Sequence, residues 1–223
     1  MRALFDLAAP IRCASCGADS DGDLCAKCAE SVVAIRSPMC ARCGAPSDGL
    51  VEACAQCLGL SGFTRARSVV AYAEPARSIT LALKRRGARE LAYVMSGLMA
   101  RVVTRDGLSG EVVTFVPGGR RARREGFDQA DLLARGVGRA MALPVRRHLF
   151  RACEGPRQAD VSMAERRGNV RDRFAARPVA GAVLLVDDVY TTGATAEACS
   201  LALLTSGAGS VDVLTWARTV RRR

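Results

Sequence analysis

The chain has 223 residues, with 33 Lys or Arg against 22 Asp or Glu, and a formal net charge of +11. This length allows one α/β domain of about 150 residues and a small second module. The absence of a run of eighteen apolar residues argues against a membrane-spanning helix. The short N-terminal apolar stretch, interrupted by Asp6, argues against a signal peptide, so we expect a cytoplasmic protein with reduced cysteines. Its positive charge indicates an anionic partner, and a polyphosphate substrate, a nucleic acid and generic solubility all agree with it.

Eight of the ten cysteines lie between residues 13 and 57, in four Cys-x-x-Cys knuckles. This spacing lets two sulfurs reach one tetrahedral ion, and it is typical of two tandem zinc ribbons, each with one structural Zn²⁺. The predicted ligands are Cys13, Cys16, Cys25 and Cys28 for the first ion, and Cys40, Cys43, Cys54 and Cys57 for the second. An interleaved pairing, first knuckle with third and second with fourth, would use the same residues. The region is too short for a sufficient apolar core, so zinc is expected to supply its folding energy.

The rest of the chain alternates short apolar runs with helical patterns, which predicts an α/β fold with a central parallel sheet. We expect a double zinc-ribbon module at 1–62, the α/β domain at 63–218 and a basic tail at 219–223. The first predicted elements are a strand at 66–72, a helix that begins at Pro75 and ends with Lys84-Arg85-Arg86, and a helix at 88–105.

A strand at 111–116 is followed by glycines and a cluster of arginines. Backbone amides can approach a ligand closely at glycines, and arginine neutralises phosphate charge, so this segment is a candidate pyrophosphate site. A solvated turn with a charge run is the alternative. The candidate residues are Pro117, Gly118, Gly119 and Arg120. A helix at 128–142 and a strand at 144–149 follow, and the polar segment 151–173 is either a lid over an anionic ligand or an exposed loop.

Residues 183–195 read VLLVDDVYTTGAT, which joins a buried strand to a Thr/Gly turn and a helical stretch at 195–204. The carboxylates Asp187 and Asp188 can hold ribose hydroxyls or a Mg²⁺-bound polyol. The amides and hydroxyls of the turn can bind a phosphate at the helix N-terminus. The turn consists of Tyr190, Thr191, Thr192, Gly193, Ala194 and Thr195. The string resembles the PRPP-binding motif of type I phosphoribosyltransferases, whereas an ordinary strand-turn-helix junction would explain the aspartates alone. A last strand is predicted at 211–216.

The order of the motifs resembles the ComF family of competence-associated, phosphoribosyltransferase-like proteins. These motifs are the cysteine knuckles, LALKRRG, a Val-Pro strand end, GF-x-QA, RQADVSMAERRGNVRDRF and VLLVDDVYTTGAT. The resemblance implies a type I phosphoribosyltransferase domain behind a zinc module, in a cytoplasmic protein linked to uptake of single-stranded DNA. It also implies that Asp187 and Asp188 bind the PRPP ribose, that residues 190–195 bind its 5-phosphate and that residues 117–120 bind its pyrophosphate. Glu125 and Asp128 stand where the family pattern has Arg and Asn.

Three functions remain open at this point. The first is an enzyme that displaces pyrophosphate from PRPP with a nitrogen nucleophile, with Mg²⁺ and arginine stabilising the leaving group. The second is a module that binds PRPP or a nucleotide without chemistry. The third is a protein that handles single-stranded DNA, with partners in the competence machinery. The low aromatic content, 4%, argues against a surface on which bases stack.

Overall fold

The computed structural model describes residues 11–86, 89–119, 127–152 and 173–220, which build a four-stranded parallel sheet with flanking elements. The strands are β1 (Arg65–Ala71), β2 (Val112–Phe115), β5 (Ala182–Tyr190) and β6 (Ser210–Arg218), and their order across the sheet is β1-β6-β5-β2. The two central strands are buried on both faces along most of their length, as expected of strands covered on both sides. The fold class predicted from the sequence, a central parallel sheet behind a cysteine-rich module, is confirmed.

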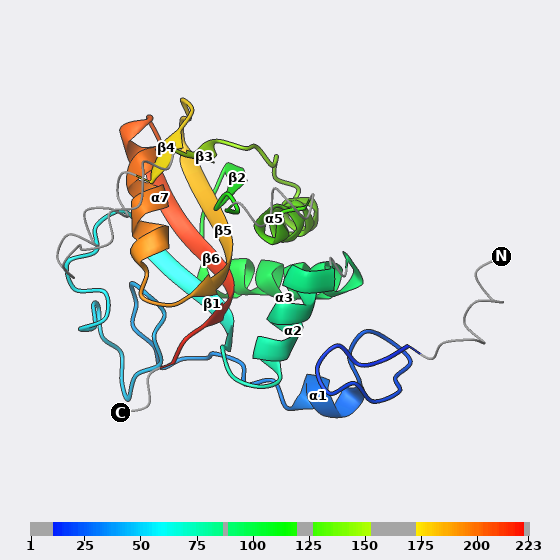
Figure 1. Cartoon of the computed structure of the whole chain (residues 1–223). Helices are drawn as coiled ribbons and strands as arrows, with labels where there is room; N and C mark the ends of the chain where they lie inside the picture. The colour runs from blue at the N-terminus through cyan, green and yellow to red at the C-terminus, as the bar shows by residue number, and fades with distance from the viewer. Residues whose placement is uncertain (1–10, 87–88, 120–126, 153–172, 221–223) are drawn as a thin grey trace, which may run out of the picture.

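Helices cover one face of the sheet and a mixed layer covers the other (Figure 1). Three helices, α2 (Ala76–Arg86), α3 (Arg89–Asp106) and α5 (Gln129–Met141), lie on the first face. The buried side chains of Leu184 and Val186 pack there. Helix α7 (Ala194–Thr205) lies on the second face, where Val183 and Leu185 point. This alternation follows from the two-residue period of a strand.

The second face also carries a short antiparallel pair, β3 (Leu149–Arg151) with β4 (Phe174–Ala176). The strand predicted at 144–149 is misplaced, because β3 begins at Leu149, the last residue of the predicted range. Ahead of β3, Val145 makes only an isolated bridge to Val113 and covers the edge of β2. Strand β4 was missed. Most of the segment between these strands, residues 153–172, on which the lid prediction falls, lies outside the described residues.

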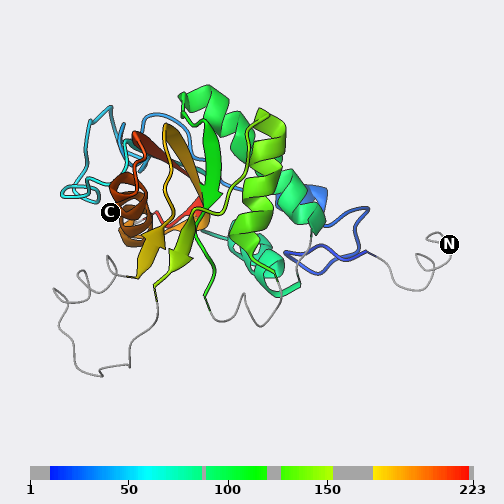
Figure 2. The same ribbon diagram turned by 90° about the horizontal axis from the view of Figure 1, so that it is seen from above.

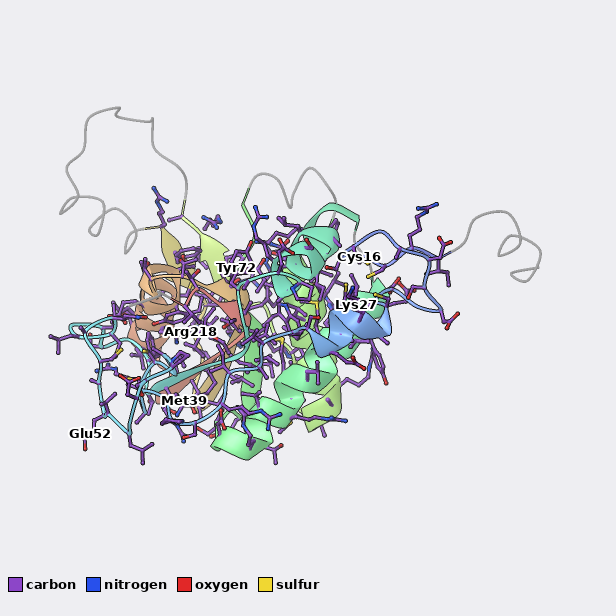
Figure 3. The ribbon with its side chains drawn as sticks, turned by 90° about the horizontal axis from the view of Figure 1, so that it is seen from below. Cys16, Lys27, Met39, Glu52, Tyr72 and Arg218 are labelled. Carbon is purple, nitrogen blue, oxygen red and sulfur yellow. The ribbon has the colours of Figure 1, made fainter. Side chains whose placement is uncertain are left out.

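The two cysteine clusters lie on opposite sides of the sheet domain (Figures 1 and 2). Figure 3 shows Cys16 and Lys27 at one end of the molecule and Met39 and Glu52 at the other. Between the clusters the chain runs antiparallel to β1. The amide of Ile35 donates to the carbonyl of Val69 at 2.9 Å, and the amide of Ala71 donates to that of Val33 at 2.8 Å. The linker thus covers the second edge of the sheet, where unpaired backbone groups would otherwise be exposed.

The first cluster, with the short helix α1 (Ala26–Glu30), contacts the helical face through Ala14, Leu24 and Val32. The second cluster is more deeply integrated. The thiols of Cys40, Cys43 and Cys57 belong to the buried group that includes Phe63 and Tyr190. The second ribbon and the sheet therefore share one core.

A buried carboxylate joins the end of the second ribbon to α7. Glu197, 4% exposed in the first turn of the helix, accepts the amides of Ser61 and Gly62, each at 2.8 Å. A side chain at Gly62 would meet the carbonyl of Glu197 at 2.8 Å, so only glycine allows this close approach. The contact fixes the helix that begins at the candidate phosphate turn.

Replacement of Glu197 by Ala should lower the free energy of unfolding by about 1–3 kcal/mol, because the buried amide of Gly62 loses its acceptor, and the part-buried amide of Ser61 loses its acceptor as well. Urea unfolding in the presence of zinc measures this. Glu74→Ala is the matched control, since Glu74 accepts the amide and hydroxyl of Ser78 on the surface and its loss should cost less than about 1 kcal/mol. Equal losses of unfolding free energy in the two variants would show that the buried contact stabilises the protein no more than the surface contact does.

Candidate functional site

The acidic pair lies inside strand β5, which extends to Tyr190, four residues beyond the apolar run. Because side chains alternate along a strand, the two carboxylates point to opposite faces of the sheet. Asp187 faces the side of α7 and stands next to Thr215 of β6, and Asp188 faces the side of α2 and α5. A ligand at the carboxyl end of β5 would meet one carboxylate from each face.

Asp187 shares a small pocket with the turn that follows β5, so the structure brings the first acid and the predicted phosphate turn together. The pocket is lined by Asp187, Val189, Tyr190, Thr191, Gly193, Thr195, Ala196 and Thr215. Burial raises the pKa of Asp187 well above its usual range, and the neighbouring carboxylate of Asp188 raises it further. The amide of Asp188, which donates to Asp187 at 2.8 Å, and the charge of Lys84 only partly oppose this. The ionised form of Asp187 is therefore disfavoured until a donor or cation approaches it.

Asp188 forms an ion pair with Lys84. Lys84 Nζ of α2 lies 2.6 Å from its Oδ2, and Gln129 Nε2 of α5 lies 3.4 Å from the same atom. The Asp188 side chain is 8% exposed and that of Lys84 33%, so the pair is partly screened by solvent. Sequence reasoning did not assign either partner to the site. The available signals were the LALKRRG motif, which holds one of only two lysines in the chain, and GF-x-QA, which holds Gln129.

The predicted phosphate turn begins helix α7. Gly193 is the N-cap with φ of +82°, a conformation that favours glycine, and Thr191 and Thr192 are exposed. The first-turn amides of a helix lack acceptors within the helix, and its positive end attracts anions. Tyr190 differs from the other turn residues because its side chain is buried behind Gly193. The side chain of Tyr190 therefore supports the turn from within.

The candidate pyrophosphate residues are placed only in part. Pro117 and Gly118 follow β2, and the carbonyl of Pro117 accepts Arg151 Nε at 3.0 Å. The amide of Gly118 donates to Asp128 Oδ2 at 2.6 Å, and the other carboxylate oxygen of Asp128 caps α5. One amide expected to face pyrophosphate thus already has an anionic acceptor. Gly119 lies beside the guanidinium of Arg151, and Arg120 lies outside the described residues.

The eight knuckle cysteines form two tetrads in chain order, which resolves the pairing in favour of tandem ribbons over the interleaved arrangement. The tetrads are Cys13, Cys16, Cys25 and Cys28, and Cys40, Cys43, Cys54 and Cys57, with all sulfurs of a tetrad within 4.8 Å of one another. Four thiolates on one Zn²⁺ lie about 3.8 Å apart. The sulfur–sulfur separations fit this geometry, with 3.8 Å for Cys16–Cys25, 3.7 Å for Cys40–Cys57 and 3.5 Å for Cys43–Cys54.

The thiols of the second tetrad differ in their ionisation. Burial opposes ionisation of Cys40, but the backbone amides of Cys43 and Arg42 lower its pKa to about 7. Burial raises the pKa of Cys43 and Cys57, so among these three thiols the thiolate form is favoured at Cys40 alone. All nine described cysteines are free of disulfides.

These features define a class of protein, a double zinc ribbon attached to a phosphoribosyltransferase-like α/β domain. A sequence profile described as a double zinc ribbon domain matches residues 4–58. The chain is 30% identical over 177 residues to the DNA utilization protein YhgH of Escherichia coli K12, covering 75% of this chain and 78% of that protein. The YhgH protein of Salmonella typhimurium matches equally. The chain belongs to the ComF family.

Two solved structures are similar to this chain at lower sequence identity. One is described as the allosteric regulatory enzyme of purine biosynthesis and shares 23% identity, with a TM-score of 0.39 over 56% of this chain. The other is glutamine phosphoribosylpyrophosphate amidotransferase from B. subtilis in complex with ADP and GMP. It has the same identity and TM-score over 55% of this chain. The chain spans about a quarter, 26%, of either structure. In the described part of the chain, no helix has the length and apolar character needed to cross a membrane.

Asp187→Asn should stabilise the protein without ligand by about 0.5–2 kcal/mol at pH 8. A carboxyl whose pKa is raised on folding makes stability fall as the pH rises from its unfolded pKa through its folded pKa, and asparagine removes that loss. The stabilisation should therefore be larger at pH 8 than at pH 5. Thermal unfolding of both proteins at the two pH values measures it, and a destabilised variant at pH 8 would contradict the assignment of a strained carboxylate.

The full chain should hold two zinc ions through sulfur, and the ion in the first ribbon should be lost faster to a chelator. The reason is access, because Cys16 is exposed and Cys25 is half-buried, whereas Cys40, Cys43 and Cys57 are buried. Release followed with a chromophoric chelator should show two phases of equal amplitude. Cys25→Ser should abolish the fast phase and Cys54→Ser the slow one. The reverse assignment would contradict the prediction.

Proposed function

We propose that this protein binds PRPP, or another ligand with a ribose 5-phosphate, at the carboxyl end of β5. The observation that carries the proposal is the pocket in which Asp187 meets the turn at the N-terminus of α7. A carboxylate suited to hydroxyls and a helix end suited to phosphate line the same pocket. Membership of the ComF family supports the same site.

Each group of residues would perform one task. The first-turn amides of α7, with the exposed hydroxyls of Thr191 and Thr192, would bind the 5-phosphate. Asp187 and Asp188 would hold the ribose hydroxyls from the two faces of the sheet. A Mg²⁺ ion, if bound with the ligand, would use the same carboxylates and would supply charge neutralisation for the pyrophosphate. Lys84 keeps Asp188 neutralised in the ligand-free protein.

Whether the ligand is turned over is a separate question. A transferase needs donors for the departing pyrophosphate, and the arginine cluster after Gly119 would supply them. A module that binds without chemistry is favoured by one observation, the donation of the Gly118 amide to Asp128, which removes a donor from that region. Both activities agree with a ComF-like role in competence and DNA uptake, in the cytoplasm, with single-stranded DNA and competence proteins as candidate partners.

Isothermal titration with Mg²⁺-PRPP tests the proposal. The wild-type chain should bind, and Asp188→Asn should weaken binding by about 1.5–3 kcal/mol, the range for hydrogen bonds to a charged group. Asp131→Asn is the matched control, since Asp131 pairs with Arg135 on the surface of α5 and should leave the affinity unchanged. Equal affinities of all three proteins would show that the ligand binds elsewhere.

Release of pyrophosphate from bound PRPP in the presence of nucleobases then separates the transferase from the binding module. A labelled oligonucleotide in the same titration tests the DNA partner. Binding of DNA through phosphates should weaken steeply with salt, with a slope of about −0.7 per contacted phosphate on a log-log plot. DNA binding without PRPP binding would overturn the proposed ligand.

A further inference from the structure

The second zinc ribbon and the candidate phosphate turn are joined by one buried arginine. Arg218, the last residue of β6, has no exposed surface. Its guanidinium donates from Nη1 to the carbonyl oxygen of Cys43, and from Nη2 to Gln56 Oε1 at 3.2 Å. Cys43 ends one knuckle of the second tetrad, and Gln56 lies inside the other knuckle. A single cation therefore holds both knuckles in the arrangement that presents four sulfurs to one ion.

The same guanidinium lies on the ring of Tyr190, with Cζ 4.8 Å from the ring centroid. Arg218 and Tyr190 are paired positions of β6 and β5, which places the contact at the end of the central strands. Phe63, which follows the ribbon, packs its ring at 85° to that of Tyr190, with 6.4 Å between centroids. Cation–π and edge contacts between buried groups are directional, so the position of Arg218 determines the position of the tyrosine ring.

The side chain of Tyr190 packs against Gly193, on the buried side of the candidate phosphate turn. A Cβ atom built on Gly193 would lie 2.3 Å from the Tyr190 hydroxyl and 3.0 Å from Leu60 Cδ1, so both side chains press directly against this glycine. The hydroxyl is buried and has no hydrogen-bond partner among the described residues, so its role there is to fill space. A shift of the ring would move the backbone that begins α7.

We propose that Arg218 and Tyr190 are positioning residues that couple zinc binding in the second ribbon to ligand binding at the turn of residues 190–195. The inference rests on the proposed function, because it takes that turn as the phosphate site. The second ribbon is then part of the ligand site, and the first ribbon is not. Among the described residues, no hydrogen bond links the first ribbon to residues 190–195.

Coupling is reciprocal, so it can be measured from both sides. In the full-length protein, saturating Mg²⁺-PRPP should slow zinc release from the second tetrad by about 5–150-fold and leave release from the first tetrad unchanged. The matched variants are Cys54→Ser and Cys25→Ser, each of which removes a half-buried ligand from one tetrad. Cys54→Ser should weaken PRPP binding, and Cys25→Ser should not.

Arg218→Lys tests the bridge itself, because lysine keeps the charge but cannot hold both acceptors and stack on the ring. This variant should still bind two zinc ions, whereas the effect of PRPP on release of the second ion should disappear. Arg135→Lys is the control, since Arg135 pairs with Asp131 on the surface of α5, on the opposite face of the sheet from α7. An unchanged PRPP effect in Arg218→Lys would overturn the role of the arginine.

A measurement without ligand separates this inference from the proposed function. Hydrogen exchange of residues 190–195 should become faster in Cys54→Ser and stay unchanged in Cys25→Ser, whether or not PRPP binds. Exchange that responds to Cys54→Ser in a protein that does not bind PRPP would overturn the proposed ligand and keep the coupling. If Cys54→Ser leaves the hydrogen exchange of residues 190–195 unchanged, the coupling is overturned, even where PRPP binds.

Discussion

A buried guanidinium must find acceptors for its N–H groups, because an unpaired charge in the interior is strongly destabilising. Arg218 finds acceptors for Nη1 and Nη2 in the second ribbon, at Cys43 and Gln56, whereas its Nε has no partner among the described residues, and its flat face lies on Tyr190. The sheet, the ribbon and the turn therefore cannot adopt their positions separately. Glu197 adds a second link of the same kind, since its carboxylate accepts two amides at the end of the ribbon.

The site combines a rigid frame with a disfavoured charge. Strand β5 pairs with β2 as far as Val186 and with β6 as far as Tyr190, so the segment that carries the two carboxylates is held by its pairing with β6. Asp188 is neutralised by Lys84, whereas Asp187 has an amide as its only hydrogen-bond donor among the described residues. Burial raises the pKa of Asp187, so a donor or cation that reaches this carboxylate would relieve part of the cost of its charge.

Much of the frame could be predicted from the sequence, because local patterns determine it. The apolar run before Asp187, the Cys-x-x-Cys spacing and the Thr/Gly turn each specify a short element without help from distant residues. The spacing left two pairing orders open, and the two tetrads decide for the tandem order; together with the double zinc ribbon profile they support two structural zinc ions. Strand β4 was missed because three residues, Phe174–Ala176, carry too little periodicity to be recognised.

The partners of the site could not be predicted, because they come from distant parts of the chain. Lys84 lies 104 positions before Asp188, and Arg218 lies 175 positions after Cys43. That last separation has a consequence for synthesis. At about 5–20 residues per second, the last cysteine of the second ribbon, Cys57, is synthesised roughly 8–32 s before the arginine that completes its core. During that interval the nascent ribbon must retain its metal by its four thiolates alone.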